Sequence, residues 1–361
     1  MTPRSLIRVL VIDDSAFSRQ AITRMLDASP LVEVVGVARD GEEALRKAFE
    51  LQPDLITVDL EMPRMDGFTF LRVIMSKRPT PVIVVSGRAG EEEVFRALEL
   101  GAVDFVGKPS PRATPELNNI EQELVRKVHA VRDLRIDRVR KRIDAVPAVI
   151  GKESGLPRLA PRVVVIGSST GGPAALMHIF SAFLDAPQCS FVVAQHMPAG
   201  FTRGFAERID RMTQLRAIEA EGGEALSPGT VLIAPGGKHL EFESTQGGVV
   251  TKLIAADDCD KYTPSVDRLF ESAARHVGTA LLAVVLTGMG DDGRSGVRSV
   301  NQVGGSVIAE SESTAVIFGM PQQAIRTGFV NQVLPLGEIA GAIQVGNRSI
   351  SRRGQDHEGT T

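Results

Sequence analysis

The sequence predicts an α/β protein with two doubly wound parallel-sheet domains joined by a linker. Short runs rich in Val and Ile alternate with amphipathic helical patterns in the first third of the chain, and the same alternation starts again near residue 161. Strands that are apolar along their whole length are typical of parallel sheets covered by helices on both faces. The length of 361 residues also fits two domains.

The first domain contains five predicted strands, each a short apolar run. They are IRVLVI (7–12), VEVVG (32–36), DLITV (54–58), PVIVVS (81–86) and VDFVG (103–107). Helical patterns separate them, over 15–28 with Asp14 or Ser15 as the N-cap, over 41–51, and onward from Pro115. Strands that alternate with helices in this way form a doubly wound parallel sheet.

Two stretches of unlike composition follow the first domain, which we place at residues 1–131. Residues 132–144 (RDLRIDRVRKRID) favour the solvated face of a helix over a contact with nucleic acid or an acidic partner. Residues 145–161 (AVPAVIGKESGLPRLAP) have the composition of a semi-flexible linker. We therefore predict a linker over 132–160.

The second domain, placed at residues 161–347, again contains five strand-like runs. They are RVVVIG (162–167), FVVA (191–194), TVLIA (230–234), LLAVVL (281–286) and SVIA (306–309). Further predicted elements are helices over 174–184, over 201–212 and after Gly293, and a β-hairpin over 238–255 with its turn at Gly247–Gly248. The domain is therefore α/β with antiparallel decoration. The polar tail is placed at 348–361, and its residues 351–361 (SRRGQDHEGTT) are expected to be disordered.

Composition excludes several classes of protein. The net charge of -3, the absence of Trp and the single Tyr argue against a nucleic-acid partner. Two cysteines, Cys189 and Cys259, are too few for a disulfide scaffold or a four-cysteine zinc site. No window has the roughly 20 apolar residues of a membrane span, and residues 1–6 (MTPRSL) lead directly into a strand rather than a signal peptide. We therefore expect a cytoplasmic protein without membrane insertion.

Acidic, hydroxyl and basic side chains end the strands of the first domain. Asp13 and Asp14 follow the first strand, Asp59 follows the third, Ser86 ends the fourth and Lys108 follows the fifth. Because the carboxyl ends of parallel strands meet at one edge of a sheet, these groups converge. Clustered carboxylates need a cation, and Mg²⁺ binds both carboxylates and phosphate oxygens. The edge is therefore predicted to bind Mg²⁺ and to form an aspartyl phosphate.

These residues resemble the receiver domain of bacterial response regulators over about residues 6–130. The resemblance implies a flavodoxin-like fold in which a partner histidine kinase phosphorylates Asp59. It also implies that Asp14 and Asp59 bind Mg²⁺ directly with the Glu61 carbonyl, and that Asp13 acts through water.

The same resemblance assigns the other strand-end residues. Ser86 is the switch hydroxyl, Phe105 the switch aromatic residue, and Lys108 the lysine that contacts the phosphoryl group. A degenerate receiver would lack one member of the set, and none is missing.

Ser169, His196 and an aspartate pair each follow a strand of the second domain. Ser169 is the centre of GSSTG (167–171), a G-x-S-x-G sequence on a strand-to-helix turn. His196 follows the next strand, and Asp291-Asp292 follow the strand 281–286. A serine, a histidine and a carboxylate at one sheet edge provide a nucleophile, a base and an orienting group.

Simpler interpretations exist for each of these residues. The serine turn also suits a helix cap or a phosphate-binding loop, and one aspartate suits a helix cap. His196 with either aspartate would make a metal site, but the spacing matches no standard zinc signature. The spacing alone does not choose Ser169 over Ser168, or Asp292 over Asp291.

Five motifs of this domain resemble the catalytic domain of chemotaxis protein-glutamate methylesterase, over about residues 161–347. They are SSTGG (168–172), QHMP (195–198), IAPGGKH (233–239), PSVD (264–267) and GMGDDG (288–293). The resemblance implies that Ser169 is the nucleophile, His196 the general base and Asp292 the orienting carboxylate of an α/β serine esterase. It further implies that the Met289 backbone helps form the oxyanion pocket and that Thr170 supports the histidine.

The resemblance implies a phosphorylation-activated hydrolase of bacterial chemosensory adaptation. The family hydrolyses glutamate methyl esters on chemoreceptor cytoplasmic helices and deamidates certain receptor glutamines, without a cofactor for the ester chemistry. Its partners are methylated chemoreceptors and a chemotaxis histidine kinase, and its unphosphorylated receiver covers the active-site cleft. Two alternatives are a DNA-binding output domain, for which no helix-turn-helix pattern or basic face is present, and a docking module without activity.

Overall fold

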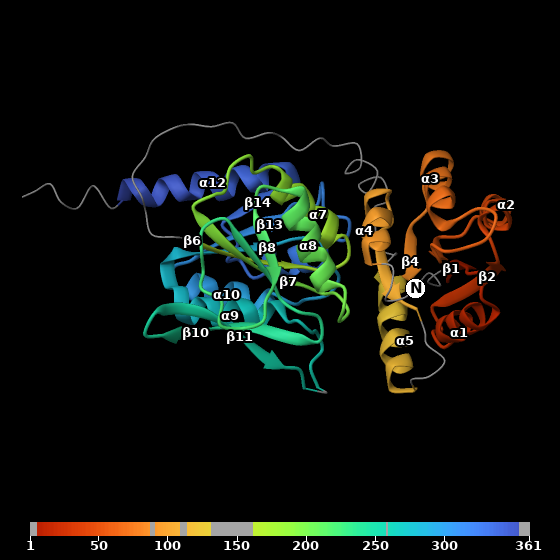
Figure 1. Cartoon of the computed structure of the whole chain (residues 1–361), viewed down its shortest axis with the longest axis horizontal. Coiled ribbons are helices and arrows are strands. Elements are labelled where there is room, and N and C mark those ends of the chain that lie inside the picture. Colours follow the sequence, from red (N-terminus) through yellow and green to blue (C-terminus); the bar gives the residue numbers. More distant parts are fainter. Residues whose placement is uncertain (1–5, 87–90, 109–113, 131–161, 258, 354–361) are drawn as a thin grey trace, which may run out of the picture. The chain divides into compact units, whose positions relative to one another are not determined.

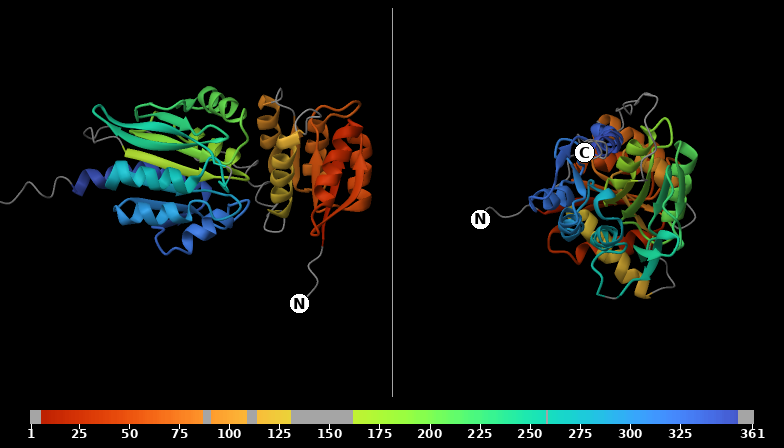
Figure 2. Two further views of the ribbon diagram at one scale, coloured as in Figure 1. Left: turned by 90° about the horizontal axis from the view of Figure 1, so that it is seen from below. Right: turned by 90° about the vertical axis from the view of Figure 1, so that its left-hand side faces the viewer.

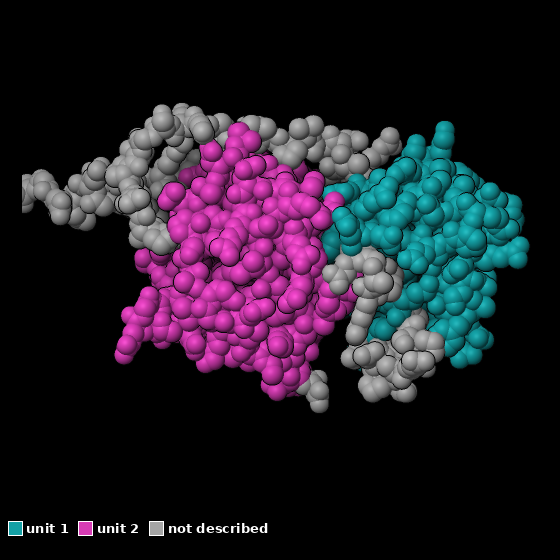
Figure 3. Space-filling model, in the orientation of Figure 1, with its two compact units in different colours: residues 1–145 teal, residues 146–361 magenta. Residues whose placement is uncertain are grey.

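The computed structural model describes residues 6–86, 91–108, 114–130, 162–257 and 259–353. The chain forms two compact units, residues 1–145 and 146–361 (Figure 3). The predicted linker, 132–160, with its basic stretch 132–144, lies outside the described residues. Among the helices that the structure describes, none is both long enough and apolar enough to cross a membrane.

The first unit contains a five-stranded parallel sheet in the order β2-β1-β3-β4-β5 (Figure 1). Its strands are β1 (Ile7–Ile12), β2 (Val32–Ala38), β3 (Leu55–Val58), β4 (Val82–Ser86) and β5 (Asp104–Gly107). Its helices are α1 (Ala16–Asp27), α2 (Gly41–Leu51), α3 (Gly67–Lys77), α4 (Glu91–Glu99) and α5 (Thr114–His129). The predicted doubly wound parallel sheet is confirmed.

Local capping signals begin the helices of the first unit. The side chains of Ser15, Asp40 and Asp66 accept hydrogen bonds from backbone N–H groups in the first turns of α1, α2 and α3. Helix α1 packs against α5, and α2 packs against α3. Val9 and Val11 of the interior strand β1 are fully buried, as expected for a sheet that helices cover on both faces.

A seven-stranded parallel sheet forms the second unit, in the order β14-β13-β12-β6-β7-β9-β8. Its strands are β6 (Arg162–Ser168), β7 (Cys189–Gln195), β8 (Arg216–Glu219), β9 (Thr230–Ile233), β12 (Leu281–Val285), β13 (Ser306–Glu310) and β14 (Gln332–Leu334). The predicted hairpin is present as β10 (Lys238–Thr245) and β11 (Gly248–Ala255). The helices are α7 (Gly172–Ser181), α8 (Thr202–Met212), α9 (Val266–Val277), α10 (Arg294–Gln302), α11 (Gly319–Ile325), α12 (Leu336–Arg353) and the 3₁₀-helix η3 (Gly278–Ala280).

The order in which successive strands join this sheet reverses next to β6. From β6 it proceeds through α7 to β7 and then to β8 and β9, and it returns through the hairpin and α9 to β12 on the other side of β6. Helices lie on both faces of the sheet (Figure 2), with α7 against α8 and α12, and α9 against α10. Open parallel sheets bind ligands at the carboxyl ends of their strands, at such a switch point.

The elements β8, β14 and α9 of the second unit were not predicted from sequence. The prediction was also wrong at the start of the polar tail, because α12 continues to Arg353, into the segment 351–361 that we expected to be disordered. No glycine or proline interrupts the chain from Asn347 to Arg353, and Gly354 follows the last helical residue. Residues 354–361 lie outside the part of the chain that the structure describes.

Candidate active site and receiver site

Three loops meet at the carboxyl edge of the second sheet, after β6, β7 and β12. Strand β6 lies between the other two and pairs with both. Ser169, His196 and Asp292 lie on these loops, and their exposed fractions are 5%, 8% and 2%. The structure therefore brings the three predicted catalytic residues to one buried edge.

The Gln195 side chain ties the serine loop to the histidine loop. Its Nε2 donates to the carbonyl oxygens of Ser169, at 3.0 Å, and of His196, at 2.9 Å. Its Oε1 accepts a hydrogen bond from Ser168 Oγ at 2.7 Å. The hydroxyl of Ser168 is therefore engaged in holding Gln195, and the two loops are fixed relative to each other.

His196 and Asp292 form a buried hydrogen-bonded pair. His196 Nε2 lies 2.8 Å from Asp292 Oδ2. Because an ionised carboxylate only accepts hydrogen bonds, Nε2 carries the proton and Nδ1 is the basic nitrogen of the neutral ring. Nδ1 is buried and has no hydrogen-bond partner among the described residues. The ring thus offers one buried acceptor, as a general base requires.

Asp292 is held at the N-terminus of α9. Its carboxylate accepts hydrogen bonds from the N–H groups of Val266, at 2.7 Å, and Asp267, at 2.8 Å, and from Ser265 Oγ at 3.1 Å. Burial raises the pKa of Asp292, but the hydrogen bonds from His196 and from the helix N–H groups outweigh burial and hold this pKa below its usual range. The carboxylate therefore stays ionised beside the imidazole.

The position of α9 depends on close packing against β6. A Cβ atom at Gly167 would lie 2.2 Å from Val266 Cγ1, so a larger residue there would displace the helix. No role was predicted from sequence for the segment PSVD (264–267). The signal for its role is Ser265, whose side chain caps α9, followed by an amphipathic pattern with Asp267 in the first turn.

Exchange of Asp267 for asparagine is expected to stabilise the protein at neutral pH. Burial raises the pKa of Asp267 to about 6, the charge of Asp292 adds to this, and the hydrogen bond from the Gly296 N–H opposes it. Since the folded pKa lies above the unfolded value, this group makes folding less favourable as pH rises from about 4 to about 6. The asparagine oxygen keeps the hydrogen bond without the charge.

The measurement is a pair of thermal unfolding series. We expect the melting temperature of Asp267→Asn to exceed that of the wild type at about pH 7.5, with the difference closing toward about pH 4–5. A variant that melts at or below the wild-type temperature at every pH contradicts the prediction.

The loop after β12 lies against Ser169. A Cβ atom at Gly288 would lie 2.8 Å from Ser169 Cβ, so glycine permits this approach. Met289 follows and is half-buried. Thr170 is buried, and its carbonyl oxygen accepts a hydrogen bond from Thr287 Oγ1 at 3.0 Å. The oxyanion role of Met289 and the supporting role of Thr170 remain predictions.

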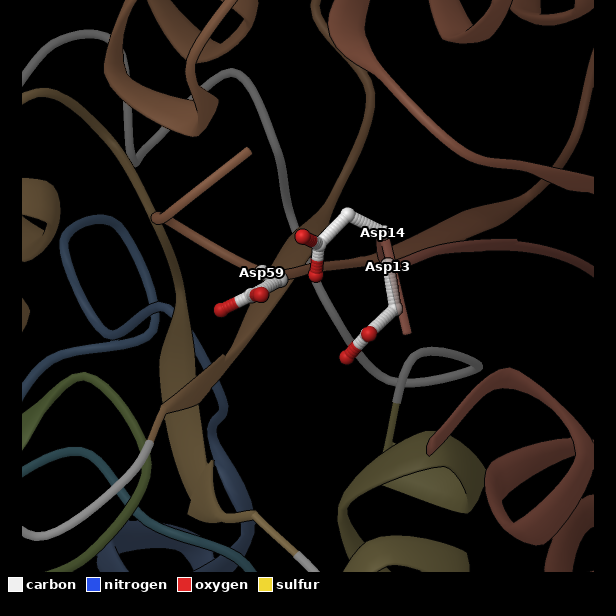
Figure 4. A group of neighbouring side chains, drawn as sticks. All are labelled: Asp13, Asp14 and Asp59. Carbon is white, nitrogen blue, oxygen red and sulfur yellow. The ribbon is translucent and has the colours of Figure 1, made fainter. Parts of the chain in front are cut away.

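In the first unit, three carboxylates converge at the carboxyl edge of the sheet (Figure 4). Asp13 and Asp14 follow β1 and Asp59 follows β3, and one carboxylate oxygen from each lies within 4.8 Å of the others. Asp13 and Asp59 are buried, whereas Asp14 is exposed. The structure thus brings the three predicted metal ligands together.

Lys108 reaches this cluster from the end of β5. Its Nζ lies 2.6 Å from Asp59 Oδ2 and 3.2 Å from Asp13 Oδ2. Burial lowers the pKa of Lys108, but the two carboxylates outweigh burial and raise it above its usual value. Burial raises the pKa of Asp13 to about 6 and also raises the pKa of Asp59. The Lys108 ammonium lowers both pKa values but does not outweigh burial. One lysine therefore does not compensate for three carboxylates.

The cluster fits Mg²⁺ by its donor set. Asp13 Oδ2 is buried and accepts no hydrogen bond among the described residues, although Lys108 stands at ion-pair distance. A buried carboxylate oxygen without a donor, next to two further carboxylates, suits a hard divalent cation with oxygen ligands. Among the described residues, no comparable group of three potential ligands includes His196.

The two predicted switch residues lie on neighbouring strands. Ser86 ends β4 and pairs with Gly107 of β5, and its side chain lies outside the described residues. Phe105 is buried, with its ring centroid 6.5 Å from that of Phe95. The Lys127 ammonium lies 5.2 Å from the Phe105 centroid. The switching roles of Ser86 and Phe105 remain predictions.

Comparison with known protein families matches each of the two units of the structure to a separate family. The model of the family described as CheB methylesterase matches residues 164–343, and that of the response regulator receiver domain matches residues 9–117. The DNA-binding output considered above is therefore not the second part of this chain.

Relatives of known name resemble the chain over nearly its whole length. Protein-glutamate methylesterase/protein-glutamine glutaminase 3 of Geobacter sulfurreducens is 49% identical, with 92% of this chain and 95% of the relative covered. A Myxococcus xanthus relative, numbered 1 under the same name, is 45% identical, with 95% of this chain and 98% of the relative covered. The crystal structure of the Thermotoga maritima CheB methylesterase catalytic domain is 42% identical, with 51% of this chain and 97% of that chain covered and a TM-score of 0.49. The chain belongs to the CheB methylesterase family and carries a response regulator receiver domain ahead of the methylesterase domain.

Proposed function

We propose that this protein is a phosphorylation-activated protein-glutamate methylesterase and protein-glutamine glutaminase that acts on chemoreceptors in the cytoplasm. The observation that carries the proposal is the buried pair of His196 and Asp292, joined at 2.8 Å, at the sheet edge that also holds Ser169. Relatives that carry the name of this double activity cover more than nine-tenths of the chain. The substrates are methyl esters and amides of glutamate side chains on receptor helices.

The first half of the reaction transfers the acyl group to the enzyme. Ser169 Oγ attacks the carbonyl carbon of the glutamate methyl ester, and its proton passes to His196 Nδ1. The resulting imidazolium is held by the ionised Asp292. When the tetrahedral intermediate collapses, the C–O bond to the methoxy group breaks, the His196 proton goes to that oxygen, and methanol leaves.

The second half releases glutamate. A water molecule gives its proton to His196 Nδ1 and attacks the acyl carbon, and the ester bond to Ser169 Oγ breaks as the proton returns to that oxygen. With a glutamine side chain, the leaving group of the first half is ammonia instead of methanol. One site therefore serves both reactions, because both are acyl transfers through a tetrahedral intermediate.

The Met289 backbone N–H is the proposed oxyanion donor. The loop that carries it approaches Ser169 closely at Gly288. A donor placed where the negative charge develops contributes about 10²–10³ in rate. Thr170, on the turn between β6 and α7, is proposed to support His196.

Phosphorylation takes place at Asp59. Asp13, Asp14 and Asp59 would hold Mg²⁺, which supplies charge neutralisation for the phosphoryl oxygens when it is bound. Asp59 Oδ attacks phosphorus, and the bond from phosphorus to the kinase histidine nitrogen, or to the acyl oxygen of the small phosphodonor, breaks. The histidine of the kinase, or the carboxylate of the small donor, is the leaving group. Lys108, 2.6 Å from Asp59 Oδ2, is placed to contact a phosphoryl oxygen.

Coupling between the two parts follows from the same proposal. The unphosphorylated receiver restrains the esterase, and phosphorylation at Asp59 changes Ser86 and Phe105 and releases this restraint. The ester chemistry itself needs no cofactor.

Exchange of Asp59 for alanine is expected to leave the basal rate of methanol release and to abolish its stimulation by acetyl phosphate and Mg²⁺, because no acyl phosphate forms. Asp27→Ala is the matched control, since this aspartate is exposed and ends α1, whereas Asp13 and Asp14 precede the start of that helix. It should retain the full stimulation. Equal stimulation of wild type and Asp59→Ala would refute the assignment.

Release of methanol from methylated receptor membranes tests the activity itself. Ammonia release from unmodified receptors with glutamine at the same positions tests the second reaction at the same site. We expect one set of variants to lower both products together. A wild-type chain that releases neither product with the phosphodonor present contradicts the proposed function.

A further inference from the structure

The ring of Tyr262 lies flat on the imidazole of His196. The two ring centroids are 4.8 Å apart, and the ring planes differ by 5°. Tyr262 lies in the loop between β11 and α9 and is half-buried. One face of the catalytic imidazole is therefore covered by an aromatic ring that the reaction steps above do not use.

Two exposed residues, Asp291 and Lys261, hold Tyr262 in place. Tyr262 Oη donates to Asp291 Oδ1 at 3.1 Å, and Lys261 Nζ donates to the same oxygen at 2.7 Å. The Lys261 ammonium also lies 4.8 Å from the Tyr262 ring centroid. Hydrogen bonds from Lys261 and Tyr262 hold the pKa of Asp291 below its usual range, so the anchor stays charged.

Gly290 makes room for the anchored hydroxyl. A Cβ atom at this position would lie 2.2 Å from Tyr262 Oη, and the backbone has a φ of 94°. The close approach of Tyr262 and the positive φ both disfavour any residue other than glycine at position 290. The segment from Gly290 to Asp292 thus provides the space for the tyrosine, its anchor and the carboxylate that binds His196.

A buried histidine holds both ends of the loop that carries Tyr262. His239 is fully buried, and its Nε2 lies 2.8 Å from Asp260 Oδ2. Its Nδ1 accepts a hydrogen bond from the Ser265 N–H at 3.1 Å. Asp260 and Ser265 stand directly before and after the segment 261–264, so the loop is fixed at both ends.

We propose that Tyr262, anchored by Asp291, is a positioning residue that holds the His196 imidazole in the orientation needed for proton transfer. The proposal rests on the proposed function. A ring stacked on one face prevents the imidazole from tilting out of line with Asp292. Its π face also attracts the imidazolium that exists only after His196 has taken the serine proton. Because Lys261 and Asp291 carry opposite charges, their ion pair adds little net charge next to the Tyr262 ring.

The activity test separates the ring from its hydroxyl. We expect Tyr262→Ala to lower kcat by about 10–100-fold with KM nearly unchanged, because a small misplacement of the base affects chemistry more than binding. Tyr262→Phe keeps the ring and should lose no more than about threefold, the size of one lost hydrogen bond. Far-UV circular dichroism and thermal melting show that each variant is folded. A Tyr262→Ala variant with wild-type kcat, or one changed only in KM, overturns the proposal.

A spectroscopic test does not depend on activity. Tyr262 is the only tyrosine, and the chain has no tryptophan, so the tyrosine fluorescence comes from this residue alone. We expect the emission yield of the wild type to differ from that of His196→Asn at the same pH, because only the wild type has an imidazole stacked on the phenol. The charged groups at the two rings are Asp292, Asp291 and Lys261, and Asp291→Asn tests the anchor in the same way.

The outcomes distinguish the two proposals. An emission difference between wild type and His196→Asn without any methanol release would leave the contact standing and reject the proposed function. Methanol release by a wild type whose emission equals that of His196→Asn would reject the role of Tyr262. We expect an emission difference, together with a loss of kcat in Tyr262→Ala that Tyr262→Phe does not show.

Discussion

Exchange of Asp292 for asparagine is expected to slow methanol release by about 10⁴-fold, the size of effect seen when the orienting carboxylate of a serine, histidine and aspartate set is made an amide. The amide can donate to the imidazole, which favours the wrong tautomer. It also brings an N–H₂ group to a place where the N–H groups of Val266 and Asp267 both need an acceptor. The rate of methanol release at saturating receptor, with folding checked by thermal melting, is the measurement.

Asp291→Asn is the matched control for this variant. It makes the same chemical change one residue earlier, at an exposed aspartate that contacts Lys261 and Tyr262. We expect it to cost less than about tenfold, since its asparagine oxygen can still accept from the tyrosine. If the two variants lost activity equally, Asp292 would have no special place in the reaction.

Replacement of Ser169 by alanine should reduce the release of both methanol and ammonia by at least about 10⁴-fold, because no acyl-enzyme can form. Binding of the receptor should change little, since only the hydroxyl oxygen is removed. The rates of both products in one preparation, with and without phosphodonor, provide the measurement. A variant that loses only one product would show that the two reactions use different nucleophiles.

Ser168→Ala is the control for the serine. The Ser168 hydroxyl donates to Gln195 Oε1, whose amide holds the loops of Ser169 and His196. Its loss leaves a buried acceptor unpaired, at about 1–3 kcal/mol of folding stability. We therefore expect a lower melting temperature with catalysis largely retained. The opposite pattern, with Ser168→Ala inactive and Ser169→Ala active, would exchange the roles of the two serines.

The strands and the edge that they share could be predicted from sequence because both are local signals. Runs such as RVVVIG mark buried parallel strands, and the residues that follow them necessarily meet at one edge of the sheet. The predicted convergence of Asp13, Asp14 and Asp59 needed no further information. Neither did the placement of Ser169 and His196 at one edge of the second sheet.

The partners of these residues could not be predicted in the same way. Which aspartate, Asp291 or Asp292, binds His196 depends on where the N-terminus of α9 lies. The position of α9 depends in turn on how closely Val266 approaches Gly167. Such contacts join segments about 100 residues apart in sequence, and no periodicity encodes them. Tyr262 was missed for the same reason, because its stacking on His196 exists only after the sheet and α9 have assembled.

Methanol release from methylated chemoreceptor membranes tests the account most directly. Wild type and Ser169→Ala, both as the full chain, are each assayed with and without Mg²⁺ and acetyl phosphate. The account predicts release by the wild type, an increase with the phosphodonor, and no release by Ser169→Ala under either condition. Release by Ser169→Ala at the wild-type rate, or no release by the wild type under any condition, would contradict it.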